Sequence, residues 1–116
     1  MARILVHSAT GPENPTRAAL ALLIARTAVD EGHEVQVFLA GDGVHLADGD
    51  KAAETNGLGT GAVAEHLAAL NDAGMTVYLS GMSSKARGIE GGEGFELAPP
   101  QKLVELAVWA EKTLTY

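Results

Sequence analysis

The chain has 116 residues, 47% of them apolar, and its 15 acidic and 8 basic residues give a formal net charge of −7. This length fits one domain with a hydrophobic core of its own, and the negative charge argues against binding to nucleic acid or anionic membranes. Cysteine is absent, which excludes disulfide bonds, thiolate metal sites and any catalysis or sulfur transfer by a cysteine of this chain.

No stretch approaches the about 18 consecutive apolar residues that suggest a membrane-spanning helix. The opening apolar run, residues 4–6, is short and is followed at once by polar residues, which is not typical of a signal peptide. We therefore expect a cytoplasmic protein.

A buried strand and a long helix are predicted at the start of the chain. Residues 4–6 are Ile-Leu-Val, a run typical of a strand that is buried on both faces. Asn14 and Pro15 predict a helix N-cap followed by proline at the first helical position. The helix is expected to run to about Asp30, with Gly32 beyond its end as the C-terminal cap.

The apolar residues of this helix are not confined to one side. Four of them follow helical spacing and are expected to face the sheet: Ala18, Leu22, Ala25 and Val29. Three more lie on other sides: Leu20, Leu23 and Ile24. A helix that is apolar around its girth needs cover besides its own sheet, and we expect another subunit to provide it.

The middle of the chain predicts one more strand and one more helix around an irregular segment. Residues 34–40 begin as an alternating pattern and end as an apolar run, which indicates a strand. The segment 44–60 is rich in Gly, Asp and small residues, so we expect an irregular excursion with one short helix. A helix is predicted over 61–73, with Gly74 as its stop.

The last third predicts two strands and a closing helix. Residues 75–80 form the third strand, and 83–87 form a single helical turn. Residues 90–94 are a flexible Gly-rich linker, and 95–97 are a short fourth strand. The final helix starts at Pro99-Pro100, and its expected core residues are Leu103, Leu106, Ala107, Ala110 and Leu114.

Strands that alternate with helices predict parallel pairing through right-handed crossovers. The expected fold class is α/β: a three-layer α/β/α domain over residues 1–116, with a small, mostly parallel, doubly wound sheet of the flavodoxin-like kind. Such sheets bind ligands outside the carboxyl ends of their strands. Here those ends are residues 8–14, 41–45 and 80–87.

Three stretches, in their order and spacing, resemble the DsrE/DsrF-like family, which includes the YchN-like proteins and sulfur-relay subunits. They are Ile4 to Val29, Gly32 to Val44, and Val77 to Ile89, the last being the most specific. The end of the chain, Trp109 to Tyr116, is similar to the family's last helix. The resemblance covers nearly the whole chain and implies a small α/β fold that assembles as trimers or hexamers.

In the sulfur-relay members, the resemblance implies a cysteine near the end of the third strand that accepts and passes a persulfide. The pattern there is Cys-Gly-x-Cys or Cys-Gly-x-Ser ahead of Ala-Arg-Gly, and the matching positions are Ser80 and Ser83. A serine hydroxyl is not appreciably ionised near neutral pH and cannot hold a transferable persulfide. We therefore expect a vestigial sulfur-relay pocket and predict no catalytic residue.

Candidate ligand-binding residues gather at the carboxyl ends of the strands. Hydroxyls, backbone N–H groups and positive charge that a small anion would use lie after the third strand, at Ser80, Gly81, Ser83, Lys85 and Arg87. Side chains expected nearby follow the first two strands: His7, Thr10, Asp42 and His45. The structural alternative is that the serines cap the helical turn and that Arg87 pairs with an acidic neighbour.

Other chemistries receive little support. The loop from Ser8 to Gly11 lacks both glycine-rich nucleotide-binding motifs, and no nucleophile elbow suggests a serine hydrolase. His7, His45 and Asp42 could approach one another, but no closely spaced ligand pair supports a metal site. We predict neither a metal nor a cofactor. Trp109 fits either a position at an interface or ordinary packing inside the fold.

Two functions from different classes remain. The first is a non-catalytic homo-oligomer, a trimer or hexamer, that binds a small molecule or anion or serves as an accessory protein. The second is an enzyme or sulfur-transfer accessory that acts through a bound small molecule or a cysteine-bearing partner.

Overall fold

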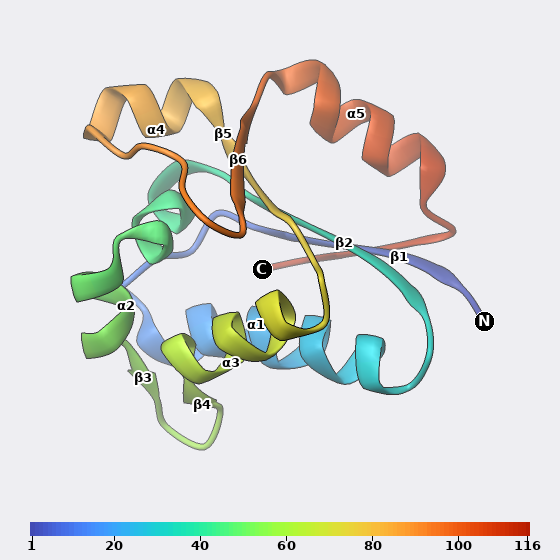
Figure 1. The fold of residues 1–116 in the computed structure, drawn as a ribbon, viewed down its shortest axis with the longest axis horizontal. Helices are drawn as coiled ribbons and strands as arrows, with labels where there is room; N and C mark the ends of the chain where they lie inside the picture. Colours follow the sequence, from blue (N-terminus) through green and yellow to red (C-terminus); the bar gives the residue numbers. More distant parts are fainter.

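Five parallel strands form a central sheet in the spatial order β6-β5-β2-β1-β7 (Figure 1). The computed structural model describes residues 1–116. The sheet strands are β1 (Arg3–Ser8), β2 (Glu34–Leu39), β5 (Val77–Ser80), β6 (Phe95–Ala98) and β7 (Lys112–Thr115). The helices are α1 (Pro15–Asp30), the 3₁₀ helix η1 (Gly41–Ala47), α2 (Gly49–Glu54), α3 (Val63–Asp72), α4 (Gly81–Arg87) and α5 (Pro100–Trp109). A short antiparallel hairpin is formed by β3 (Asn56–Gly57) and β4 (Gly61–Ala62).

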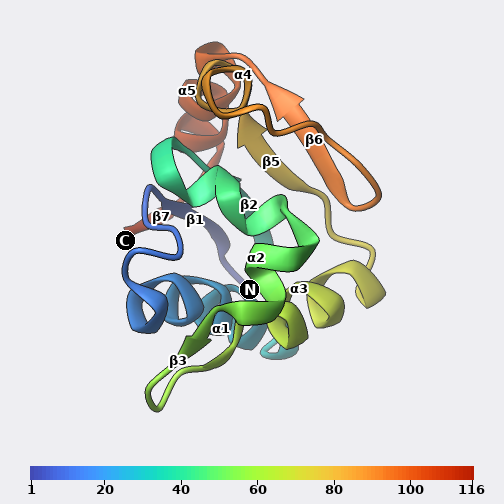
Figure 2. The same cartoon turned by 90° about the vertical axis from the view of Figure 1, so that its left-hand side faces the viewer.

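The sheet lies between two layers of helices, which confirms the predicted α/β/α class (Figures 1 and 2). The larger core packs α1 and α3 against one face of the sheet, around Val6, Val37 and Leu79. The smaller core packs Leu106 of α5 against Leu5 on the other face. Strand residues alternate between the two cores because successive side chains of a strand point to opposite faces.

The signals at the ends of α1 act as the sequence predicts. Asn14 is the N-cap, and its side-chain oxygen accepts a hydrogen bond from the Arg17 N–H at 3.2 Å. Pro15 opens the helix, and the chain leaves it through Gly32, whose φ of 87° is a left-handed conformation that glycine adopts without steric cost.

Part of the cover that we expected from another subunit comes from the same chain. Helix α3 and the β3–β4 hairpin both pack along α1. The three apolar residues on the other sides of α1 are partly buried within the single chain: Leu20, Leu23 and Ile24. The apolar girth of α1 is therefore not, by itself, an argument for oligomers.

The segment after β2 is more ordered than predicted. It contains η1, α2 and the hairpin instead of a single short helix in an irregular excursion. Asp48 caps α2 by accepting hydrogen bonds from the N–H groups of Asp50 and Lys51. The following helix, α3, begins at Val63 and not at Gly61, because Gly61 and Ala62 pair with β3.

The prediction of a closing helix up to Leu114 is wrong. Helix α5 ends at Trp109, Ala110 has extended backbone angles, and β7 pairs in parallel with β1. Arg3 fixes the chain where it turns from α5 into β7. Its backbone N–H and carbonyl oxygen form hydrogen bonds with Glu111, and its guanidinium donates to the Trp109 carbonyl oxygen. The open edge of β1 offers backbone partners to the last residues, and Leu114 is exposed on that edge strand instead of packing in a helical core stripe.

Candidate functional site

Ser80 lies at the carboxyl end of β5 and serves as the N-cap of α4. Its Oγ accepts a hydrogen bond from the Ser83 N–H at 3.2 Å. Because Ser80 caps the helix, α4 begins at Gly81, two residues before the predicted helical turn, and it ends at Gly88 in a left-handed conformation. Another hydroxyl group of α4, that of Ser84, is fully buried and has no hydrogen-bond partner.

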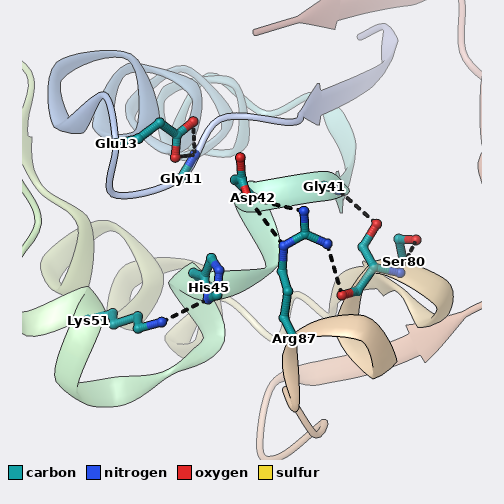
Figure 3. A network of polar contacts seen from close by, with 9 residues as sticks. Gly11, Glu13, Gly41, Asp42, His45, Lys51, Ser80 and Arg87 are labelled. Carbon is teal, nitrogen blue, oxygen red and sulfur yellow. Dashed lines mark hydrogen bonds and ion pairs between the residues drawn. The ribbon is translucent and has the colours of Figure 1, made fainter.

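Three hydrogen bonds, one from Gly41 and two to Asp42, tie α4 to the start of η1 (Figure 3). The Gly41 N–H donates to Ser83 Oγ at 2.9 Å. The guanidinium of Arg87 donates to Asp42 Oδ1 at 3.1 and 3.2 Å, and to the Ser83 carbonyl oxygen at 3.2 Å. The serine cap and the Arg87–Asp42 ion pair are the contacts that the structural alternative predicted. They leave the guanidinium of Arg87 partly neutralised, and Asp42 is half exposed, so water screens the pair.

A polar cleft lies on the other side of Asp42, between the β1–α1 loop, η1 and α2. Its volume is about 430 Å³, and its walls are Pro12, Glu13, Asp42, His45, Lys51 and Glu54. Asp42 and His45 are candidates that the sequence predicted. Glu13, Lys51 and Glu54 were missed, since two of them belong to a segment expected to be irregular and their proximity depends on how η1 and α2 fold back toward the first loop.

Lys51 and His45 form a pair of basic groups inside this cleft. Lys51 Nζ lies 3.0 Å from His45 Nδ1 (Figure 3). An ammonium group only donates hydrogen bonds, so in this contact Lys51 is the donor and His45 Nδ1 is the acceptor. The cleft thus presents a lysine ammonium, an imidazole and the carboxylates of Glu13 and Glu54, an arrangement that suits a small polar molecule with donors and acceptors of its own.

The loop after β1 does not offer its backbone to an anion. Both carboxylate oxygens of Glu13 accept a hydrogen bond from the Gly11 N–H, at 3.0 and 3.1 Å. A Cβ on Gly11 would lie 2.1 Å from the Asp42 carbonyl oxygen, so only glycine lets the loop approach η1 this closely. The Glu13 carboxylate thus already takes the Gly11 N–H that an anion at this loop would use, in agreement with the absence of a nucleotide-binding motif.

The remaining candidates do not join the cleft. His7 lies on the α5 face of the sheet beside Phe38, with ring centroids 6.3 Å apart, and burial lowers the pKa of its imidazole. Thr10 is buried in the loop, where its N–H donates to Ser8 Oγ, and Lys85 is exposed on α4. No group of three or more His, Asp or Glu side chains is placed to hold a metal ion.

None of the helices is both long and apolar enough to cross a membrane.

Comparison with known proteins agrees with this fold. The protein is of the α/β class, with a small parallel sheet whose polar residues gather at the carboxyl ends of the strands. The model of the DsrE/DsrF-like family matches residues 2–116. The chain therefore belongs to the DsrE/DsrF-like family. The crystal structure of the ychN protein from E. coli superposes with a TM-score of 0.82 at 21% sequence identity, over 100% of both chains. That likeness supports the fold alone. A search of curated protein sequences finds no match.

Proposed function

We propose that this protein is a non-catalytic, homo-oligomeric member of the DsrE/DsrF-like family that binds a small molecule or anion, or serves as an accessory protein, and whose sulfur-relay pocket is vestigial. The hydrogen bonding of Ser80 carries this proposal. In the family resemblance, Ser80 stands where a relay cysteine would stand, and its hydroxyl caps α4.

Two properties of Ser80 argue against a catalytic role. Its Oγ makes a hydrogen bond with the Ser83 N–H and has none with a histidine or carboxylate that could act as a base. Activation of a serine nucleophile requires such a base. A hydroxyl group also cannot replace a thiolate in persulfide transfer. The scaffold around the family position is thus kept without a group that performs the transfer.

The polar cleft beside Asp42 is the proposed binding site. It is the hollow that contains two of the predicted residues, Asp42 and His45, and it adds a lysine and two glutamates. Two donors that an anion could use are already bound: the Arg87 guanidinium donates to Asp42, and the Gly11 N–H donates to Glu13. A small polar molecule that meets Lys51, His45 and Glu54 fits these contacts better than a simple phosphate.

The proposed oligomer is a trimer or hexamer in the cytoplasm. It is supported by the exposed apolar side chains of Met82 and Leu97, which lie together at one apolar surface between α4 and β6. Exposed apolar side chains that lie together on a surface commonly mark a contact with another protein.

Native mass spectrometry of freshly purified protein tests both parts of the proposal. A trimer or hexamer whose mass equals a whole number of bare chains, and which gains the mass of a small polar molecule when one is added, supports it. A monomer at micromolar concentration contradicts the oligomeric part. Extra mass that is present from the start and is lost on denaturation identifies a resident ligand.

The alternative function, an enzyme or sulfur-transfer accessory that uses a cysteine-bearing partner, is favoured by one observation. The N-cap geometry at Ser80 and the contacts from η1 to α4 hold the family position in an ordered pocket edge. A cysteine-bearing protein that copurifies in a fixed stoichiometry, and that is lost when Ser80 is replaced by a bulky residue, would establish this function instead.

A further inference from the structure

The β3–β4 hairpin carries an apolar side chain at its tip that the fold does not use. Leu58 lies between the two strands of the hairpin and is 89% exposed. In both cartoon views the hairpin projects from the end of the molecule opposite to α4 and the start of α5 (Figures 1 and 2). A leucine in this position contributes nothing to the core and exposes apolar surface to water.

The hairpin tip is nevertheless held firmly. The Leu58 N–H donates to Thr16 Oγ1 at 3.1 Å, and the Thr60 hydroxyl donates to the Thr16 carbonyl oxygen at 2.9 Å. The ring of the buried His66 bonds the Thr60 carbonyl oxygen at 2.7 Å. Three side chains thus fix a loop whose exposed residue is apolar. Such pre-organisation reduces the entropy that a contact at Leu58 would lose.

An apolar groove lies at the opposite end of the molecule. It has a volume of about 350 Å³ and lies between α4, β6 and the start of α5, with walls made by Gly81, Met82, Leu97, Ala98, Pro99 and Pro100. Met82 is 71% exposed at its rim. The groove is shallow and open, with space for an aliphatic side chain to lie on it, and none of its wall residues is charged.

The net charge of the chain indicates which molecule can occupy the groove. A copy of this chain carries a net charge of −7, so two copies repel one another over most of their surface. Residues 55–64, which contain the hairpin, have no ionisable side chain, and neither have the groove segments 79–84 and 97–101. Two acidic copies can meet at these segments without placing like charges face to face. A basic partner, in contrast, would be attracted to the acidic surfaces.

We infer that copies of this chain associate head to tail, with Leu58 of one copy seated in the groove beside Met82 of the next. The inference rests on the proposed homo-oligomer and specifies its contact. Leu58, the knob of this contact, and the groove lie on different surfaces at opposite ends of the molecule, so the interface is heterologous. It produces a closed ring when successive rotations between copies add up to a full turn.

Two single substitutions test the two sides of this contact. Leu58→Glu places a charge on the knob and Met82→Glu places one at the groove, and each should raise the dissociation constant of the oligomer by at least about 30-fold. The matched control is Val108→Glu, which adds the same charge to an exposed apolar residue on α5, 82% exposed and outside the groove. Light scattering after size exclusion measures the mass, and circular dichroism verifies that each variant is folded.

A mixture of the two variants separates this arrangement from any other. The Leu58→Glu chain keeps an intact groove and the Met82→Glu chain keeps an intact knob, so together they have one working contact. An equimolar mixture should form a one-to-one heterodimer and nothing larger.

The outcomes are distinct. A wild-type monomer would overturn both the oligomer and this contact. A wild-type oligomer that survives Leu58→Glu or Met82→Glu, or dissociates only with Val108→Glu, would overturn the contact and leave the proposed oligomer standing. If all three variants dissociate, the heterodimer in the mixture supports the contact, and its absence overturns it.

Discussion

Ser80 caps a helix, a structural role that does not require any reactivity of its hydroxyl group. The N-cap of a helix needs a side-chain acceptor for a free backbone N–H, and serine meets that need at the end of β5. A thiolate would accept the same hydrogen bond. The local backbone is therefore compatible with both residues, whereas persulfide chemistry is compatible only with cysteine.

Ser80→Cys should accordingly create a thiol whose pKa is below the ordinary value of about 8.5. The Ser83 N–H and the N-terminus of α4 both favour the thiolate. Alkylation rates measured against pH report this pKa without interference, because the chain has no other cysteine. Ala107→Cys, on the exposed side of α5, is the control, and equal titration of the two thiols would contradict a vestigial relay site.

His7 should make the stability of the protein depend on pH. Burial lowers the pKa of His7 in the folded protein, so the unfolded chain binds more protons between that value and the ordinary pKa of about 6.5. The free energy of unfolding should therefore fall as the pH falls through this range. Urea denaturation at several pH values measures the slope, and His7→Gln should make it shallower. An unchanged slope would show that His7 does not contribute.

At the level of secondary structure elements, some glycines end helices, and others leave room for a neighbouring side chain. Gly32 and Gly61 both have a left-handed φ, 87° and 86°. A Cβ on Gly32 would meet nothing within 4 Å, whereas a Cβ on Gly61 would lie 2.7 Å from His66 Nε2. Only the second glycine is therefore required by packing as well as by its backbone angle.

Replacement of these two glycines by alanine separates the two effects. Gly32→Ala should lower the free energy of unfolding by about 1–2 kcal/mol, the cost of a left-handed alanine. Gly61→Ala should cost about 1–3 kcal/mol more, because it also displaces His66 from the Thr60 carbonyl oxygen. Urea denaturation of the two variants side by side gives the difference. Equal losses would mean that the hairpin adapts without strain.

For the whole molecule, charge and exposed apolar surface oppose one another. Fifteen acidic residues against eight basic ones make copies of the chain repel, and the exposed apolar side chains of the hairpin, α4 and β6 favour contact. At an ionic strength of about 0.1 M, salt largely screens the repulsion between exposed charges that lie more than about 10 Å apart. Salt does not weaken the contact of uncharged surfaces.

The proposed oligomer should therefore become tighter as the salt concentration rises. Sedimentation velocity at an ionic strength of about 0.02 M and of about 0.3 M, with the protein at one concentration, measures the change. Glycerol at matched density serves as the control for solvent effects. An oligomer that dissociates in salt would show that ion pairs between the copies dominate the interface.

Much of the fold could be predicted from the sequence because its signals are local. The apolar run of β1, the Asn14-Pro15 start of α1 and the glycine at its end each depend on neighbouring residues. The end of the chain could not be predicted in this way. The spacing of Leu106, Ala110 and Leu114 fits a helix, but β1 offers an open edge more than 100 residues earlier in the chain, and β7 pairs with it.

The candidate site could likewise be predicted only where local sequence signals were enough. The sequence alone determined that this chain has no thiol chemistry and that its polar residues follow the strand ends, since composition and strand order do not depend on packing. Only the tertiary structure decided which of these residues meet. It joins Arg87 to Asp42 across 45 positions and brings Glu13 to the cleft of His45 and Lys51, because α2 and η1 fold back over the first loop.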